Sequence, residues 1–142
     1  MPPVIERSAT EVRKNFAQTL NDSEYRRPQF FNRNHQVFSL MGTQDLARIM
    51  ATANIQVAVM QDDDIFIVTS ETIGDLVAYG ATHDQAIAAF CEDLYDYAQE
   101  YYANYELYSR APNRAGHLPY VFRALLAEGP EGVRPMLEVA CA

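Results

Sequence analysis

The sequence has few cysteines and no long apolar run, and both absences exclude classes of protein. No stretch approaches the roughly 18 to 20 apolar residues of a membrane-spanning helix, and the first residues lack the apolar segment of about seven or more residues in a signal peptide. The two cysteines, Cys91 and Cys141, form neither a metal-binding spacing nor a disulfide framework. The sequence therefore predicts a soluble, cytoplasmic protein with no membrane partner and no cofactor.

The chain also lacks a Pro/Gly-rich linker, an internal repeat and a low-complexity segment. Its 142 residues suffice for one ordinary domain or two small ones. Apolar residues make up 49% of the chain and aromatic residues 11%, which is enough for a packed core. Residues 51–54 are the only candidate boundary, so we expect one unit at 1–53 and a second at 54–142.

Positive charge is scarce in the second part of the chain. Residues 1–50 contain seven Lys or Arg and five Asp or Glu, a net charge of +2, whereas residues 51–142 contain four and fourteen, a net charge of −10. Together they give the chain its net charge of −8. The asymmetry hints at a first part that faces a polyanion and a second, acidic module.

The first unit carries the signals of a strand followed by a helix. Val4 and Ile5 form a short strand candidate, and Ser8 with Glu11 matches a capping box, in which each side chain bonds the other residue's amide. The pattern predicts a helix over 9–21 that ends at the turn residues 21–23. Its expected apolar stripe is Ala9, Val12, Phe16 and Leu20.

Two short apolar runs then predict a hairpin, with strands at 30–31 and 37–40. Asn34 and His35 tolerate a positive φ better than most residues, so a tight turn between the strands needs no glycine. Gly42 interrupts the strand pattern, and Thr43 is a suitable N-cap for a helix over 44–53. The apolar face of that helix is expected to be Leu46, Ile49 and Met50.

The second unit begins with three strand candidates, at 55–60, 65–70 and 76–80. Residues Ile55, Val57 and Val59 alternate with other side chains, which predicts one buried strand face. A T-x-x-Q capping box at 82–85 then opens a long helix. Its expected stripe is Ile87, Phe90, Cys91, Leu94, Ala98, Tyr101 and Tyr105. Residues 121–127 predict a short helix, and residues 136–142 fit a strand or a helical turn.

The first unit resembles the N-terminal unit of the prevent-host-death (Phd/YefM-type) antitoxins. The resemblance lies in the run 8–16, in Phe31-Asn32-Arg33-Asn34, in the strand 37–40 and in the helix start at 43–46, and it covers residues of about 1 to 53. Asn34-His35 stands where family members usually have a glycine. The resemblance implies a β-α-β-β-α unit that pairs into a dimer and binds DNA.

The second unit looks like the core of HicB-type antitoxins over roughly residues 54–105. The similarity lies in the alternating IQVAVM, the acidic turn QDDD, and the segment from Phe66 to Phe90. Ile73-Gly74 replaces the usual proline-glycine of that family. The combined fold class is therefore α+β, with a Phd/YefM-like β-α-β-β-α dimerisation unit followed by a HicB-like β-β-β-α unit.

The resemblance to the Phd type also implies a DNA-contacting set of residues: Thr10, Arg13, Lys14, Arg33 and Asn34. Lysine and arginine neutralise phosphates, and the amides of a capped helix N-terminus can receive one. The alternative is that Arg13, Lys14 and Arg33 are ordinary solvated surface residues. The net charge of −8 also opposes DNA binding.

No catalytic or metal site is expected. The three consecutive carboxylates Asp62, Asp63 and Asp64 cannot all point at one ion, so a solvated turn is favoured over a cation site. The HicB-type core is similar in fold to ribonuclease H, but a two-metal nuclease needs several carboxylates on its strands, and these strands carry almost none. The tyrosines of residues 95–108 lack interleaved Lys or Arg, which favours packing over base stacking.

These patterns lead to one functional hypothesis with two rivals. The hypothesis is an antitoxin of a toxin-antitoxin system, which binds operator DNA as a dimer, represses its own operon and neutralises a toxin protein, plausibly a small ribonuclease. The first rival is a metal-dependent nuclease of ribonuclease-H type. The second is an oligomeric interaction module, a dimer or larger, that does not bind DNA.

Overall fold

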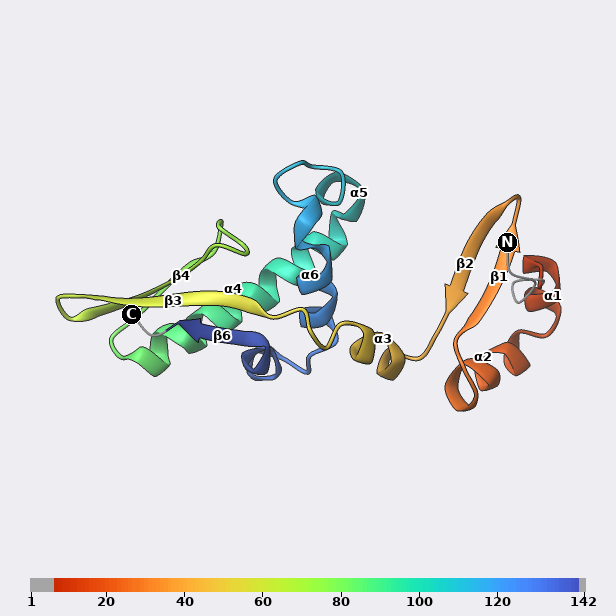
Figure 1. Ribbon diagram of the computed structural model, residues 1–142, viewed down its shortest axis with the longest axis horizontal. Coiled ribbons are helices and arrows are strands. Elements are labelled where there is room, and N and C mark those ends of the chain that lie inside the picture. Colours follow the sequence, from red (N-terminus) through yellow and green to blue (C-terminus); the bar gives the residue numbers. More distant parts are fainter. Residues whose placement is uncertain (1–6, 141–142) are drawn as a thin grey trace. The chain divides into compact units, whose positions relative to one another are not determined.

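The computed structural model describes residues 7–140 (Figure 1). The chain divides into two compact units, unit 1 (Met1–Ile49) and unit 2 (Met50–Ala142). Unit 1 holds a two-stranded sheet and unit 2 a four-stranded sheet, each with helices. The architecture is therefore mixed α+β, as predicted. The strand expected at Val4–Ile5 lies outside the described residues.

Unit 1 begins with two short helices, α1 (Ala9–Lys14) and α2 (Phe16–Tyr25), so the single helix expected over 9–21 is wrong. The break is at Asn15, with φ −122° and ψ 40°. The Asn15 backbone N–H and side-chain amide both donate to the Glu11 carbonyl oxygen, at 3.1 and 3.3 Å. Such local bonds of asparagine compete with helix propagation.

The break also changes which residues of the expected stripe are buried. Val12 is buried as expected, but Phe16 and Leu20 are exposed, and the polar residues Thr19 and Ser23 are buried in their place. Two of the four predicted stripe positions therefore do not contribute to the core, because α2 does not continue the phase of α1.

The hairpin of unit 1 is formed by β1 (Gln29–Arg33) and β2 (Gln36–Leu40), which pair antiparallel. The turn has only two residues, Asn34 at φ 50° and His35 at φ 67°. Positive φ at both central residues is the geometry of a type I′ turn, whose twist matches the strands. The predicted glycine-free turn is confirmed, although the strands extend closer to it than expected.

Helix α3 (Thr43–Ile49) ends unit 1 and is shorter than the predicted helix over 44–53. It begins at Thr43 itself, and the Gly42 carbonyl accepts hydrogen bonds from the amides of Asp45 and Leu46. No residue of α3 is buried. The apolar face expected on this helix is therefore not packed into a core within the chain.

The sheet of unit 2 has the strand order β5-β4-β3-β6. Strands β3 (Ile55–Asp62), β4 (Ile65–Ser70) and β5 (Val77–Gly80) are consecutive and antiparallel, as the sequence predicts. Strand β6 (Leu137–Ala140) comes from the end of the chain and pairs parallel to β3. The last segment is therefore a strand, and its partner lies about eighty positions earlier in the chain.

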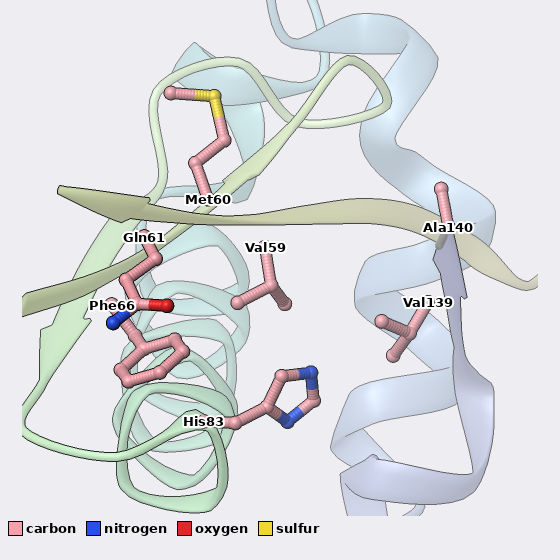
Figure 2. Close-up of a pocket in the computed structure, with 7 residues that line it drawn as sticks. All are labelled: Val59, Met60, Gln61, Phe66, His83, Val139 and Ala140. Atoms are coloured by element: carbon pink, nitrogen blue, oxygen red, sulfur yellow. The ribbon is translucent and has the colours of Figure 1, made fainter. Parts of the chain in front are cut away.

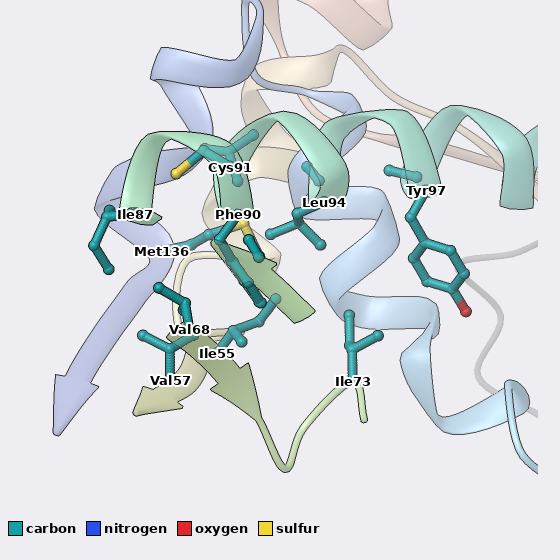
Figure 3. Close-up of a cluster of buried hydrophobic side chains, with 14 of the residues drawn as sticks. Ile55, Val57, Val68, Ile73, Ile87, Phe90, Cys91, Leu94, Tyr97 and Met136 are labelled. Carbon is teal, nitrogen blue, oxygen red and sulfur yellow. The ribbon is translucent and has the colours of Figure 1, made fainter. Parts of the chain in front are cut away.

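One face of this sheet packs against helix α4 (His83–Ala103), and the core lies between them (Figure 3). The predicted alternation on β3 is confirmed, because Ile55, Val57 and Val59 are buried. On α4 the predicted stripe is buried except for its last member, which follows the helix, and the structure adds Tyr97 to it. Thr82 caps the helix by accepting from the Gln85 amide at 3.1 Å.

The remainder of unit 2 packs on α4 and returns the chain to the sheet. It consists of α5 (Tyr105–Tyr108), a 3₁₀ turn (Ala115–His117), α6 (Leu118–Leu125) and a 3₁₀ segment (Pro130–Met136) before β6. Helix α6 begins three residues before the predicted position of 121, with a proline in its first turn. A proline is tolerated there because the first amides of a helix have no partner inside it.

Candidate nucleic-acid interface

The five residues predicted to contact DNA all lie on the surface of unit 1. Thr10, Arg13 and Lys14 belong to α1, Arg33 ends β1, and Asn34 is the first residue of the hairpin turn. All five are exposed. None of the five side chains is buried in the core, so all of them are accessible to a large ligand such as DNA.

The backbone brings the start of α1 beside the end of the hairpin. The Asn32 amide donates to the Arg7 carbonyl at 2.9 Å, and Ser8 and Asn32 form an isolated parallel bridge. Thr10 follows this bridge by two residues and Arg33 by one. The structure thus brings Thr10 close to the end of the hairpin. Arg13 and Lys14 lie in the last turn of α1, roughly 5 Å from Thr10 along the helix axis at a rise of about 1.5 Å per residue.

The cationic side chains of this surface differ in whether they have an ionic partner. Among the described residues, no carboxylate lies within 4 Å of the charged groups of Arg13, Lys14 or Arg33; the ion pairs of unit 1 are Arg26–Asp22 at 3.6 Å and Arg48–Asp45 at 3.9 Å. The first three side chains thus retain uncompensated positive charge at the surface. A phosphate or a base edge is the kind of acceptor that such groups bind.

The helix N-terminus contributes less to anion binding than the sequence suggested. The Ser8 hydroxyl accepts from the Glu11 amide at 3.2 Å, so one of the orphan donors is already used. Because α1 has only six residues, few peptide dipoles add up along its axis. The cationic side chains are therefore the main anion-binding groups of this surface.

One functional residue of unit 1 was missed by the sequence analysis. Arg7 donates to Gln29 Oε1 at 3.1 Å and to the buried Thr19 Oγ1 at 3.0 Å, which joins α2 to β1. This arginine thus connects α2 to β1, the strand that ends at Arg33. Because its partners are 12 and 22 positions away, no local spacing in the sequence indicates the contact.

A second polar cluster lies in unit 2, where Tyr97, on α4, contacts His117. The Tyr97 hydroxyl oxygen and His117 Nδ1 are 2.7 Å apart. Burial raises the pKa of Tyr97 to about 12, with Asp75 adding to the rise and Arg114 opposing it. Burial also lowers the pKa of His117, although Asp75 opposes this. No local spacing in the sequence indicates this pair, because the two residues lie 20 positions apart.

Tyr101 and Tyr108, the neighbours of Tyr97 in this cluster, pack within unit 2. Tyr101 is fully buried, and its hydroxyl donates to the Arg114 carbonyl at 3.0 Å. The Arg114 guanidinium carbon lies 4.2 Å from the Tyr108 ring centroid and 5.7 Å from that of Tyr97. These contacts fix the 110–117 loop to α4, which is the packing role expected for Tyr97, Tyr101 and Tyr108. Tyr102, for which packing was also expected, is 65% exposed.

Few groups of the described residues could support catalysis. No cluster of three or more His, Cys, Asp or Glu that could hold a metal ion occurs within residues 7–140. Asp62 ends β3, and Asp63 has φ 54° in the hairpin turn that follows. Cys91 is buried, and its pKa is raised mainly by burial. In the same range, no helix is long and apolar enough to cross a bilayer.

The comparison with protein families identifies the chain. A family model described as an antitoxin of toxin-antitoxin systems, RelE/RelB, named PHD_like, matches residues 4–139. The chain belongs to this antitoxin family. No curated protein sequence matches it.

A solved structure supports the same assignment for the antitoxin. It is described as the antitoxin part of a proposed toxin/antitoxin system from Syntrophomonas wolfei subsp. wolfei. The similarity extends over 96% of this chain and 98% of that chain, with a TM-score of 0.90 and 29% sequence identity. Both comparisons therefore describe antitoxins, which are regulatory proteins that act on a toxin.

Proposed function

We propose that this antitoxin binds operator DNA through its Phd/YefM-like first part, residues 1–53, and thereby represses its own operon. The observation that carries the proposal is the set of three exposed cations, Arg13, Lys14 and Arg33, with no ionic partner among the described residues. Thr10 and Asn34 adjoin these cations along the chain and complete the surface. Hydroxyl and amide groups of this kind contact phosphates and base edges.

We further propose that two copies pair through unit 1. Of its described residues only Val12, Thr19 and Ser23 are buried, whereas Phe30 is 45% exposed and Phe38 is 43% exposed. A unit with so little buried apolar surface is marginal by itself, and a two-stranded hairpin needs a partner for stability. Pairing would cover these side chains and gather two sets of cations, one from each copy.

Dimerisation doubles the cationic surface that faces DNA, although it doubles the net negative charge as well. Each unit carrying residues 1–50 contributes +2, while residues 51–142 contribute −10. Two such units on a palindromic site contact DNA with twice the cationic surface of one. The acidic residues 51–142 repel the DNA phosphates, and salt screens this repulsion. The affinity for operator DNA is thus expected to depend on sequence contacts as well as on charge.

The HicB-like second part, residues 54–142, holds the partner toxin in this proposal. The partner is a small ribonuclease, and the antitoxin neutralises it by binding. The antitoxin itself is proposed to have no nuclease activity, because the carboxylates Asp62, Asp63 and Asp64 lie together at one hairpin and do not surround a metal pair. Specific cleavage of RNA with magnesium or manganese that Asp64→Asn abolishes would contradict this.

A mobility-shift titration on the DNA directly upstream of the gene tests the operator proposal. We expect a retarded band that unlabelled upstream DNA displaces and a scrambled duplex of equal length does not. Sedimentation equilibrium at micromolar protein tests the pairing, for which a dimer or larger species is expected. Absence of a specific shift with an intact dimer would favour the interaction module without DNA binding.

A further inference from the structure

The sheet of unit 2 has one covered face and one uncovered face. Helix α4 packs on the side of Val57, Val59 and Val68, which are buried. The side chains that alternate with them point away from the helix, as Figure 2 shows for Met60 relative to Val59. The apolar residues on this second side form what we call the outer sheet face: Ala58, Met60, Ile65, Ile67, Val77 and Tyr79.

The outer sheet face is continuous across three strands. Met60 pairs with Ile67, and Ile67 pairs with Tyr79, so three large apolar side chains stand side by side. Met60 is 54% exposed and Tyr79 is 60% exposed. A solvated face of an antiparallel sheet normally carries polar side chains. A contiguous apolar patch in its place marks an interaction surface.

Carboxylates flank this patch at both ends. Asp62 is the outward residue at the end of β3 and is followed by Asp63 and Asp64 in the turn. Glu138 lies on β6 opposite Gln56, and the side-chain amides of Asn54 and Gln56 donate to its carboxylate. Amide donors hold the Glu138 side chain in place but do not neutralise its charge.

The charge around the patch is mostly negative, although Arg123 donates to Asn54 Oδ1 next to Glu138. Residues 49–109 contain eleven Asp or Glu and no Lys or Arg. In the described part of unit 2 the ion pairs involve Asp84 alone, with His83 at 4.0 Å and Arg134 at 3.5 Å. The acidic groups beside the outer sheet face therefore remain uncompensated within the chain.

We propose that the outer sheet face is the docking surface for a basic partner protein, one with an apolar patch flanked by Lys and Arg. The inference rests on the proposed function, in which unit 2 holds the toxin. Charge complementarity selects this occupant, because opposite charges around an apolar centre favour association and orient it. A second copy on the same face would bring the Asp62 and Glu138 carboxylates of both chains together, which costs energy.

Docking on this face would also inhibit a ribonuclease, because it would cover the groups with which the enzyme binds RNA. A ribonuclease needs cations to bind the phosphates of RNA. A surface that pairs those cations with Asp62, Asp63, Asp64 and Glu138 competes directly with the RNA backbone. The apolar residues exclude water from the centre of the contact, where aromatic side chains such as Tyr79 contribute most to affinity.

The test uses the full chain and, as probe, the protein encoded by the reading frame adjacent to its gene. Both are purified from the coexpressed complex, and binding is measured by calorimetric titration for the wild type and for variants. Tyr79→Glu places a charge at the centre of the outer sheet face. Tyr102→Glu is the matched control, since Tyr102 is 65% exposed on α4 and lies away from that face.

We expect Tyr79→Glu and Met60→Glu each to raise the Kd by about tenfold or more, and Tyr102→Glu to change it by less than about twofold. The double variant Asp62→Asn, Glu138→Gln should raise the Kd and weaken its dependence on salt. Circular dichroism confirms that each variant folds.

Three results would overturn the proposal in distinguishable ways. If the wild type does not bind the probe, the proposed toxin-holding function fails and the docking surface falls with it. If the wild type binds but Tyr79→Glu and Met60→Glu bind equally well, only the docking surface is wrong. If Tyr79→Glu instead sediments as a smaller species than the wild type while binding the probe equally well, the occupant is a second copy.

Discussion

Tyr97 and His117 form a hydrogen bond of 2.7 Å between the phenol oxygen and Nδ1, which joins α4 to the turn before α6. The pKa of Tyr97 is raised to about 12 and that of His117 is lowered, in both cases chiefly by burial. Both shifts favour the neutral form. The hydrogen bond therefore joins a neutral phenol and a neutral imidazole, and the imidazole tautomer decides which of them donates.

This pair makes the stability of unit 2 depend on pH. Because the pKa of His117 is lower in the folded protein than its unfolded value of about 6.5, protonation favours the unfolded chain. The stabilisation is present above about pH 6.5 and is lost as the pH falls toward the folded-state pKa. Urea unfolding at about pH 7.5 and about pH 5.5 measures the loss, which should be smaller in His117→Gln. An equal loss in both proteins would refute the assignment.

Removing the His117 imidazole tests the same hydrogen bond directly. His117→Ala leaves the buried hydroxyl of Tyr97 without its partner, which should lower the free energy of unfolding by about 1–3 kcal/mol. The double variant with Tyr97→Phe removes the unsatisfied group and should recover part of the loss. Strict additivity of the two single variants would mean that the hydrogen bond contributes nothing.

The hairpin turn of unit 1 offers a stabilising substitution. His35 has φ 67°, a conformation that strains most side chains but not glycine. His35→Gly should therefore raise the free energy of unfolding by about 0.5–1 kcal/mol. Gln36→Gly, one residue later in β2, is the control and should destabilise, because β2 is regular strand. Thermal unfolding followed by circular dichroism would distinguish the two, and a loss of stability in His35→Gly would contradict the turn geometry.

Gly80 is required where β5 meets the start of α4. A Cβ at this position would overlap the backbone of Ala86 and lie 2.7 Å from the Gln85 carbonyl carbon. Gly80→Ala should therefore cost about 1–3 kcal/mol in stability, as in other overpacked sites. Gly116→Ala, where nothing lies within 4 Å, should change stability by less than about 0.5 kcal/mol. Chemical denaturation of both variants measures the contrast, and equal effects would contradict it.

The sequence predicted the elements that repeat a strong local pattern. The buried face of β3 and most of the α4 stripe were correct because long, regular alternation and helical spacing leave little choice of face. The sequence of strand β6 fits a strand or a helical turn equally, since only its pairing with β3, distant in the chain, makes it a strand. The break at Asn15 was missed because its cause is a pair of local bonds to the Glu11 carbonyl rather than a change in polarity.

The sequence predicts that the candidate DNA-contacting side chains are exposed, but it does not predict the contacts that hold α2 and β1 together. The cations on α1 and at the hairpin were expected at the surface, and they are exposed. The contact of Arg7 with Gln29 and Thr19, which holds α2 to β1, required the tertiary structure. Packing of Tyr97 was expected, but the sequence did not indicate His117 as the distant partner that its buried hydroxyl needs.

The last prediction concerns the contribution of individual arginines to operator binding. Arg13 and Arg33 are exposed, and neither has a carboxylate within 4 Å among the described residues. If they contact base edges, Arg13→Ala and Arg33→Ala should each weaken binding of the specific site by about 1–3 kcal/mol. If they contact phosphate, binding should weaken on all sequences alike, and the salt slope should fall by about one.

Arg26→Ala is the matched control for these variants. Arg26 is an exposed arginine of the same unit, but its guanidinium lies 3.6 Å from the Asp22 carboxylate. Its charge is therefore partly compensated, and its loss should change operator affinity less than the loss of Arg13 or Arg33. Mobility-shift titrations at two salt concentrations, with circular dichroism to verify folding, compare the three. If Arg13→Ala and Arg33→Ala bind as tightly as Arg26→Ala and the wild type, this surface does not read DNA, and the hairpin then serves only to build unit 1.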